Sequence, residues 1–291
     1  MLYAKGRASA VMKFETHAEY DPRQSEMVKR AFLSVWSSFT RWHDDLVLLG
    51  GLVPKFICNP LPAHSVLKPT TTIDVDLGIA LGTESGQYDP ISTALAGQGF
   101  YADPKQKHRY VKTIAGMEVP VDFLVEHGAD DEGMVAVDDI AATVMPGVDR
   151  ALETARFIEI QGEDLQGAEQ HVTARVCDAG PFIALKLRAF GDRQQGKDVF
   201  DLLYTIVNYE QGTQAAVDGF AEEVRAGNPA CRDAIRCLET LFKDEQAPGP
   251  MRASHFLLGP PGESGHPDEA FRRTQIRQQM VDVAAALRRV L

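Results

Sequence analysis

The sequence predicts an α+β fold, in which a small mixed β-sheet with flanking helices precedes an all-helical C-terminal domain. Short apolar runs separated by turn residues, the pattern of strands, extend to about residue 125. From about Pro181 the apolar residues recur at helical spacing instead. With 291 residues, 44% of them hydrophobic, the chain can form one large domain or two small ones with a real core.

The N-terminal half begins with a predicted helix and a predicted strand. The apolar run Leu46–Leu49 predicts a buried strand, and Gly50-Gly51 predicts a tight turn after it. Three prolines between residues 59 and 69 predict a loop. Residues 25–43 predict an amphipathic helix, because apolar residues that we expect in the core recur there at helical spacing: Met27, Ala31, Phe32, Val35, Trp36, Phe39 and Trp42.

The next elements complete the predicted sheet. Residues 72–81 alternate as a strand, with Asp74 and Asp76 on one face and apolar residues on the other. Residues 89–97 predict a helix, with Asp89 as its N-cap and Pro90 as its first residue. Two further strands, 109–114 and 118–125, are expected on either side of a turn at residues 115–117.

The C-terminal half is expected to be entirely helical. The repeated Pro and Gly of residues 248–265 predict a break before the last helix. We therefore expect a domain over residues 1–178 that contains the sheet and a helical domain over residues 179–291. Helical periods predict helices at residues 182–190, 197–208, 214–225, 230–242 and 268–291.

The composition restricts the location and the partners of the chain. No run approaches the roughly 18 to 20 apolar residues of a membrane span, and residues 1–20 lack the apolar core of a secretory signal. We therefore expect a cytoplasmic protein with no membrane partner. The net charge of -11 argues against wrapping a long nucleic acid, but not against local contact with an RNA end. The cysteines are scattered and predict reduced, mostly buried thiols: Cys58, Cys177, Cys231 and Cys237.

Two carboxylates on the strand at residues 72–81 are the strongest sign of chemistry. Alternate residues of a strand point to the same face, so Asp74 and Asp76 converge. Two convergent carboxylates among apolar residues repel each other and lose hydration unless a divalent cation lies between them, and oxygen ligands suit Mg²⁺ or Mn²⁺. An isolated Asp-x-Asp is more often the exposed face of a sheet, so the prediction of a metal site depends on the motifs around it.

Those motifs are a third carboxylate and a pair of glycines. Asp122, on the neighbouring predicted strand, is expected to be a further metal ligand or the base that accepts a proton from an attacking hydroxyl. Gly50 and Gly51 have no Cβ, so their backbone can approach phosphates and offer N–H donors. The alternative for the two glycines is a plain turn. In combination, these features predict metal-assisted phosphoryl transfer.

The same residues carry a family resemblance. Three segments resemble the nucleotidyltransferase superfamily of DNA polymerase beta, the CCA-adding enzymes and the antibiotic nucleotidyltransferases: Leu48-Leu49-Gly50-Gly51, Thr72-Ile73-Asp74-Val75-Asp76-Leu77 and Val121-Asp122-Phe123-Leu124. Within this superfamily the chain is most similar to the AbiEii toxin-like group, known from phage defence and toxin-antitoxin systems. The likeness covers roughly residues 45–205, and the interval from Gly51 to Asp74 is longer than in the compact members. Downstream it continues in Lys186-Leu187-Arg188-Ala189 and Arg193-x-x-x-Lys197-Asp198-x-x-Asp201-Leu202.

The resemblance implies an enzyme that transfers NMP from an NTP to an acceptor hydroxyl. It implies a toxin that acts on tRNA or another cellular acceptor, with a cognate antitoxin as partner, and that uses Mg²⁺ or Mn²⁺. It also implies that Lys186 contacts the triphosphate, which the Lys197-Asp198-x-x-Asp201 segment orients. A second reading is transfer to a small molecule or a protein side chain. The alternative from another class is a catalytically idle nucleotide sensor or partner-binding module, against which the three Asp residues and Lys186 weigh.

Charge alone supports part of the downstream assignment. Lys186, Arg193 and Lys197 can neutralise phosphates while Asp198 and Asp201 hold those side chains in place. Lys186 and Arg193 share a helix face only if the helix continues past the glycine at 191. The alternative is an exposed i,i+4 pair of Lys197 and Asp201 with little energetic effect.

Three other patterns are assigned no catalytic role. Residues 191–197 fit the start of a Walker A loop, but Asp198 stands where Ser or Thr binds magnesium, and a helix precedes the loop instead of a strand, so we reject this reading. The eight histidines show no metal-binding spacing. A basic run is expected to be a solvated hairpin more than an RNA contact: Lys105, Lys107, His108, Arg109 and Lys112.

Overall fold

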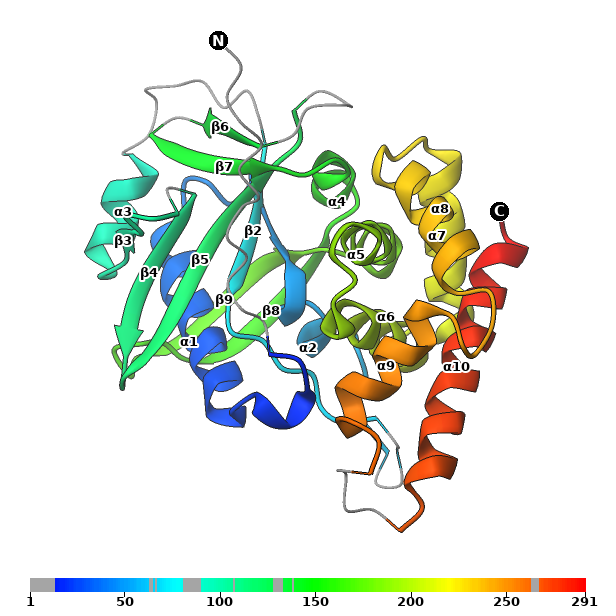
Figure 1. Cartoon of the computed structure of the whole chain (residues 1–291). Coiled ribbons are helices and arrows are strands. Elements are labelled where there is room, and N and C mark those ends of the chain that lie inside the picture. Colours follow the sequence, from blue (N-terminus) through cyan, green and yellow to red (C-terminus); the bar gives the residue numbers. More distant parts are fainter. Residues whose placement is uncertain are drawn as a thin grey trace.

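The structure is a computed structural model, and it divides into a sheet with its covering helices and a group of packed helices (Figure 1). The strands of the described chain form one mixed nine-stranded sheet in the order β3-β4-β5-β2-β1-β9-β8, with β7 beside β5 and β6 beside β7. None of the described helices is long and apolar enough to cross a membrane. The structure describes residues 14–62, 65, 67–80, 90–106, 108–127, 133–137, 139–262 and 267–291.

The elements follow the chain in two groups. The strands are β1 (Leu46–Leu49), β2 (Val75–Ile79), β3 (Tyr101–Ala102), β4 (Arg109–Ile114), β5 (Met117–Val125), β6 (Met134–Val137), β7 (Ile140–Val144), β8 (Arg156–Glu163) and β9 (Glu169–Val176). The helices of the sheet half are η1 (His17–Glu19), α1 (Pro22–Ser38), η2 (Gly50–Leu52), α2 (Pro54–Ile57), α3 (Ile91–Gly97) and α4 (Val148–Glu153), where η marks a 3-10 helix. The remaining helices are α5 (Ala179–Arg193), α6 (Gly196–Asn208), α7 (Thr213–Arg225), α8 (Ala230–Leu241), α9 (Pro248–Leu258) and α10 (Glu269–Arg289).

Strand β2 lies near the middle of the sheet. It pairs antiparallel with β1 and parallel with β5, and β4 pairs antiparallel with β5. The registers place Leu49 opposite Asp76, Asp76 opposite Asp122, and Asp122 opposite Arg109. A single row of residues across four strands therefore contains two carboxylates and one guanidinium.

The two faces of the sheet carry different kinds of residue. Gly78 points the same way as Asp76 and lies against Val148 of α4, so α4 covers the face of the carboxylates. Phe123, which alternates with Asp122, packs its ring against Phe39 just after α1. Helix α1 thus covers the opposite, apolar face, and the carboxylates point toward the side on which α4 and α5 lie.

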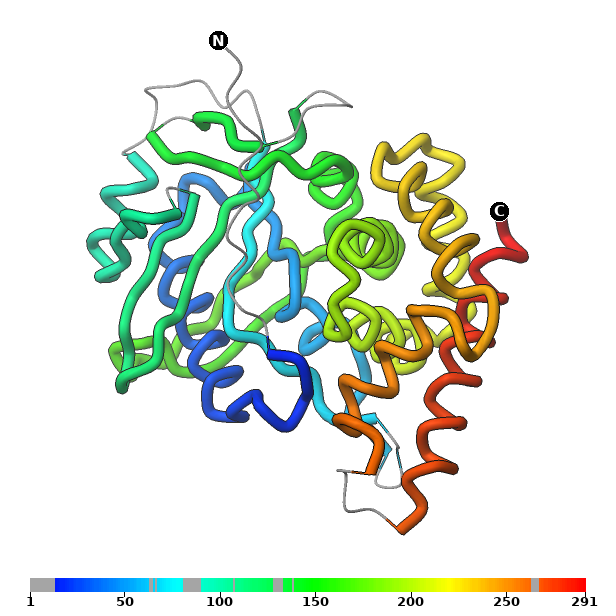
Figure 2. Tube along the Cα trace, in the orientation of Figure 1, coloured from blue at the N-terminus to red at the C-terminus, as the bar shows by residue number. Residues whose placement is uncertain are grey.

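The C-terminal helices pack in layers beside the sheet. Helices α5 and α6 lie closest to the strands, and α7, α8, α9 and α10 surround them on the outer side (Figures 1 and 2). The buried apolar residues form one continuous cluster from the sheet into these helices. This cluster fixes α5 and α6 beside the acidic face.

Several predicted elements are present with shifted ends. Helix α1 begins at Pro22, earlier than predicted, because Asp21 caps it by accepting the Arg23 amide at 2.9 Å. Strand β2 is shorter than the predicted strand at 72–81, whose last residue lies outside the described residues. The predicted N-cap Asp89 also lies outside them, and Pro90 precedes the helix. The Asp139 carboxylate caps α3 instead, by accepting the Ile91 and Ser92 amides.

The prediction of a break over residues 248–265 was wrong in its first half. Pro248 and Pro250 begin helix α9, where the missing proline N–H costs no hydrogen bond. The break is confined to the residues after Leu258, of which 263–266 lie outside the described residues. The sequence analysis also did not predict α4, β6, β7 or the β8–β9 hairpin.

Candidate functional site

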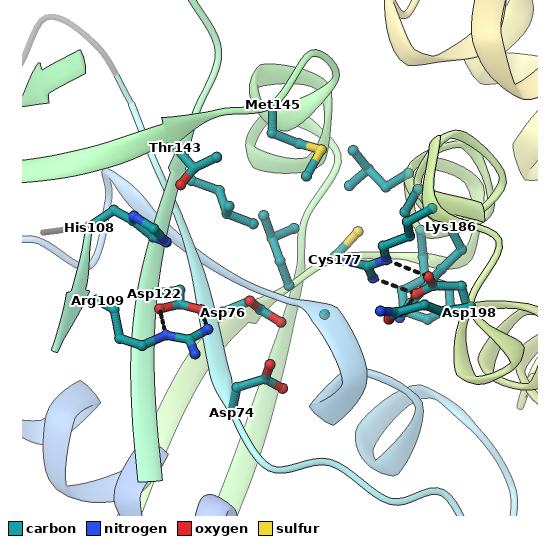
Figure 3. A pocket seen from close by; sticks show the side chains of 18 of the residues that line it. Asp74, Asp76, His108, Arg109, Asp122, Thr143, Met145, Cys177, Lys186 and Asp198 are labelled. Carbon is teal, nitrogen blue, oxygen red and sulfur yellow. Dashed lines mark hydrogen bonds and ion pairs between the residues drawn. The ribbon is translucent and has the colours of Figure 1, made fainter. Parts of the chain in front are cut away.

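Three carboxylates meet on the face of the sheet that α4 covers. Asp74 immediately precedes β2, Asp76 lies on β2, and Asp122 lies opposite Asp76 on β5. One oxygen of each carboxylate lies within 4.8 Å of the others, with Asp74 and Asp122 buried and Asp76 half-buried. Figure 3 shows Asp76 and Asp122 side by side on neighbouring strands, with Asp74 on the segment that leads into β2. The structure brings together the three acids that the sequence analysis singled out, in a cluster that can hold a metal ion.

Gly50 makes room for one of these carboxylates. Its φ is +70°, a value that favours glycine, and a Cβ there would lie 1.8 Å from Asp76 Oδ2. The backbone after β1 can therefore approach the acid cluster only because the residue is glycine. The two-glycine turn thus has a steric role in the acid site, in addition to the phosphate contact predicted for it.

Gly51 lies against a different part of the site. A Cβ on Gly51 would lie 2.7 Å from Thr72 Oγ1 and 2.8 Å from Lys197 Nζ. The Thr72 hydroxyl donates to Asp74 Oδ1 at 2.9 Å. The glycine turn, Asp74 and helix α6 are thereby packed at one point, which connects the sheet to the helical half of the molecule.

Arg109 forms a two-pronged ion pair with the third carboxylate. Its Nε donates to Asp122 Oδ1 at 2.8 Å, and its Nη2 donates to Asp122 Oδ2. Burial raises the pKa of the Asp122 carboxyl above its usual value, the Arg109 guanidinium opposes part of this rise, and Asp74 adds to it. The expected solvated hairpin is therefore wrong for Arg109, whose side chain is only 9% exposed.

Cationic side chains face the acids from helices α5 and α6. Lys186 Nζ donates to Asp201 Oδ2 at 2.7 Å and lies 3.4 Å from Asp198 Oδ1. Burial opposes the charge of Lys186, but the carboxylates of Asp201 and Asp198 outweigh it and raise its pKa. Arg193 donates from Nε and Nη2 to the two Asp198 oxygens, each at 2.7 Å. Helix α5 continues past the glycine at 191, so Lys186 and Arg193 both reach the same carboxylate.

Lys197 and Asp201 form a buried pair, not the exposed pair considered above. Lys197 Nζ donates to Asp201 Oδ2 at 2.6 Å, and both side chains are almost fully buried. Asp201 thus accepts from two lysines at one oxygen. A pair of this kind depends strongly on both partners, because removing one leaves a buried uncompensated charge. The residues that fit the start of a Walker A loop join helix α5 to helix α6. This position after a helix is consistent with the rejection of the Walker A reading.

A cavity of about 230 Å³ separates the acids from the cations. Asp74, Asp76 and Asp122 line one wall, while Lys186 and Asp198 line the other, as Figure 3 shows; Arg193 also lines the cavity. The described lining residues do not include Gly51, Lys197 or Asp201, which lie behind the walls. The cavity also has apolar lining residues, which are Leu49, Leu124, Met145, Phe182, Leu185 and Ala189.

The cavity also contains a cysteine that the sequence analysis treated as structural. Cys177 is fully buried, and burial raises the pKa of its thiol well above the usual value. A protonated thiol is a poor nucleophile, so the geometry gives no support to covalent catalysis by Cys177. All four cysteines are free thiols, with Cys58 half-buried and the other three buried.

The donor set fits a hard divalent cation. All its candidate ligands are carboxylate oxygens, the type that magnesium and manganese bind. The carboxylate of Asp76 occupies the space that a Cβ at Gly50 would fill, and the Thr72 hydroxyl orients Asp74. Arg109 contacts both oxygens of the third carboxylate, Asp122.

The sequence analysis did not assign five polar residues that line the cavity to the site: Gln106, His108, Arg109, Thr143 and Gln195. Arg109 and His108 were placed in a basic run, and Thr143 lies on the unpredicted strand β7. The ring nitrogen Nδ1 of His108 lies 3.1 Å from Met134 Sδ on β6. The register of the β4–β5 hairpin is the signal that identifies Arg109, as the pairing of Ile114 with Met117 places Arg109 opposite Asp122.

Comparison with known proteins adds no relative to this geometry. The sequence matches no protein-family model and no curated protein. The functional argument therefore stands on the site itself: three carboxylates on a sheet, a glycine turn against one of them, and buried cations across a shared cavity.

Proposed function

We propose that the chain is a metal-dependent nucleotidyltransferase of the polymerase-beta-like type that transfers NMP from an NTP to an acceptor hydroxyl and releases pyrophosphate. The observation that carries this proposal is the opposition of three carboxylates and two cations, Lys186 and Arg193, across one cavity. Phosphoryl transfer requires positioning and charge neutralisation more than covalent chemistry. An acidic wall for a metal and a cationic wall for phosphates meet that requirement.

The acidic wall would hold the metal. Asp74 and Asp76 are the residues best placed to bind Mg²⁺ or Mn²⁺, and the bound ion would neutralise phosphate charge. Gly50 keeps the space beside Asp76 open, and Thr72 holds Asp74 by a hydrogen bond. Asp122 completes the wall next to Arg109.

The cationic wall would anchor the triphosphate. Lys186 and Arg193 line the cavity and keep their charge because Asp198 and Asp201 stabilise it. Asp198 orients both cations, so we assign it a positioning role. Lys197 lies behind the wall and holds Asp201 and the Gly51 turn, so we assign it a positioning role as well.

The biological setting follows from the resemblance to the AbiEii toxin-like group. It supports a toxin-type role in phage defence, a tRNA or another cellular acceptor, a cognate antitoxin and a cytoplasmic location. The acidic net charge of -11 is consistent with contact limited to an RNA end, because extended phosphate contacts require clustered cations.

The proposal is tested by incubating purified protein with Mg²⁺, total cellular RNA and each α-labelled NTP in turn. Label is expected in tRNA with the wild type and not with Asp74→Ala/Asp76→Ala. Binding of NTP without transfer to RNA, protein or small-molecule pools would reject the enzyme and favour the idle-sensor alternative. Growth arrest on expression, lost in Asp76→Ala, is expected of a toxin.

A further inference from the structure

We propose that the protein has a second ligand site, in a cavity separate from the acid site, and that this second cavity binds an uncharged nucleoside. The inference goes beyond the proposed function and does not depend on it, because the second cavity contains none of the residues assigned above to metal or phosphate binding. The chemistry of its wall defines the ligand as a flat ring with polar edges and no net charge.

The second cavity has a volume of about 380 Å³ and lies among η1 and the helices α1, α2 and α6, which are labelled in Figure 1 except for η1. This volume is within the range of small-molecule sites. The second cavity shares no described lining residue with the cavity between the acids and the cations. Thr72 lies between the two, because its neighbour Thr71 lines the second cavity while its own hydroxyl donates to Asp74 in the first.

Two aromatic side chains in the wall have polar atoms without a partner. Tyr204 on α6 is only 7% exposed, and its hydroxyl makes no hydrogen bond with any described residue. Tyr204 lines the second cavity, so the little surface that it keeps belongs to the cavity wall. Buried hydroxyls of folded proteins are normally paired, and an unpaired one reduces stability. A bound molecule that pairs with Tyr204 would explain why this hydroxyl is kept.

His17 supplies a complementary group on the same wall. Its Nε2 donates to the Pro69 carbonyl at 2.8 Å, which leaves Nδ1 as an acceptor with no partner among the described residues. The rings of His17 and Tyr204 lie 5.7 Å and 5.9 Å from the ring of Phe200, so one aromatic side chain supports both. The second cavity thus offers a phenol donor and an imidazole acceptor.

The wall has no net charge to offer a ligand. Its charged residues within the described chain are Glu26 and Lys55, which pair with each other at 2.6 Å. Burial lowers the pKa of His17 below its usual value of 6.5, so the imidazole is neutral near pH 7. A phosphate group would therefore enter the second cavity without a free cation to compensate it.

The remaining wall suits the face of a flat ring. Proline rings and aromatic faces pack well against each other, as in the recognition of proline-rich peptides by aromatic grooves. A nucleobase presents such a face, and its edge carries acceptors and donors for Tyr204 and His17. An uncharged nucleoside combines these features without a phosphate. The prolines that line the second cavity are Pro22, Pro54, Pro60 and Pro69.

The first test titrates the intact chain with adenosine, cytidine and uridine in turn, by calorimetry, without metal or NTP. At least one of them is expected to bind at one site with a Kd below about 1 mM. Its 5′-monophosphate should bind at least about fivefold more weakly, because the wall does not compensate its charge. The cavity of Lys186 and Arg193 would favour the monophosphate instead. No binding of the three nucleosides up to about 2 mM, or tighter binding of the monophosphate, would overturn the inference.

The second test removes one hydroxyl. Tyr204→Phe should weaken binding of that nucleoside by about three- to tenfold, because one hydrogen bond is lost. The urea midpoint of the free chain should stay the same or rise, since the hydroxyl has no partner in the described chain. The matched control is Tyr110→Phe, a buried tyrosine that lines neither cavity, and it should leave the affinity unchanged. Equal affinities of Tyr204→Phe and the wild type would contradict the inference.

The third test needs no substitution. Cys58 lines the second cavity and is half-buried, whereas the other three cysteines are buried. Burial raises the pKa of its thiol to about 12, so alkylation by iodoacetamide is slow and is followed by mass spectrometry at about pH 9. Saturating nucleoside should slow the alkylation of Cys58 at least about fivefold. An unchanged rate would overturn the inference even if the variants do not fold. None of the three readouts uses NMP transfer, so a failure of the proposed function leaves them intact.

Discussion

The absence of a Cβ at one glycine, Gly50, is required by the geometry of the acid site. Gly50 is required both by its φ of +70° and by the 1.8 Å that would separate a Cβ from Asp76 Oδ2. Gly116 offers a comparison, because its φ is +80° but no described atom lies within 4 Å of the position of its Cβ. A Cβ at either glycine would therefore strain the backbone, but only a Cβ at Gly50 would also clash with a side chain, that of Asp76.

Gly50→Ala is expected to abolish transfer activity and metal binding, because the methyl group displaces the Asp76 carboxylate. Gly116→Ala should cost only the strain of a left-handed residue, about 1–2 kcal/mol, and keep its activity. The check is NMP transfer and Mn²⁺ binding in both variants, with their unfolding free energies measured in parallel. An active Gly50→Ala would show that Asp76 is not held as described.

The buried charges behind the cavity dominate local stability. Asp201 is fully buried and accepts from Lys186 and Lys197, so Asp201→Ala leaves two ammonium groups with less compensation. We expect a loss of about 3–5 kcal/mol in the free energy of unfolding. Urea denaturation measures it, with Asp218→Ala on the exposed face of α7 as control. A loss similar to that of the control would contradict the assigned role of Asp201.

Residue identities could be predicted where they depend on alternation along one strand. Asp74 and Asp76 follow from the period of two, and Asp122 from its place on the next strand. Arg109 could not be found because the turn was placed over three residues, 115–117. A turn of that length pairs Arg109 with Phe123, whereas the observed pairing of Ile114 with Met117 places it opposite Asp122. A slip of one residue exchanges the faces of a strand.

At the scale of elements, the sequence predicts the helices and strands whose apolar residues recur with a clear period. It misses the elements that are held in place by tertiary contacts. β8 and β9 are half-exposed strands, so their alternation is weak; β9 is held by β1 and by α1, whose Trp36 Nε1 donates to Thr173 O at 3.2 Å. Helix α9 was missed because Pro248 and Pro250 occupy its first turn, where proline is tolerated. Helix α3 is capped by the side chain of Asp139, a residue far away in the chain, which accepts the Ile91 amide.

The β4–β5 hairpin positions both Arg109 and Asp122, and its turn is not optimal. Ala115 has a φ of +49° and Gly116 one of +80°, and two positive values are those of a type I′ turn, which favours Asn-Gly. We expect Ala115→Asn to raise the free energy of unfolding by up to about 1 kcal/mol and to leave activity unchanged. Chemical denaturation is the measurement. A destabilised variant would mean that the turn, and with it the register, differs.

At the scale of the whole molecule, the segment before α1 connects the two halves. His17 Nε2 donates to the Pro69 carbonyl at 2.8 Å, and its ring packs against Phe200 of α6 and Phe256 of α9. Burial lowers the pKa of His17 below its usual value of 6.5, with Lys68 and Lys197 contributing in the same direction. The docking of this segment therefore depends on a neutral imidazole.

This dependence predicts a loss of stability in mild acid. Because the folded chain binds the His17 proton less readily than the unfolded chain, this contribution to stability is complete above pH 6.5 and declines as the pH falls through that value. Urea denaturation at about pH 7.5 and about pH 5.5 measures the decline. It should be smaller in His17→Gln than in the wild type. An equal decline in both would assign the pH dependence to other groups.

The central claim is that the cavity between the carboxylates and the cations transfers a nucleoside monophosphate. The most direct measurement compares the same NTP labelled at the α-phosphate and at the γ-phosphate, with Mg²⁺ and a cellular RNA and protein pool as acceptor. The account predicts that α-label enters the acceptor while γ-label appears only in pyrophosphate, and that Asp76→Ala and Lys186→Ala abolish both products. Transfer of γ-label to the acceptor, or α-label transfer that survives in Asp76→Ala, would contradict it.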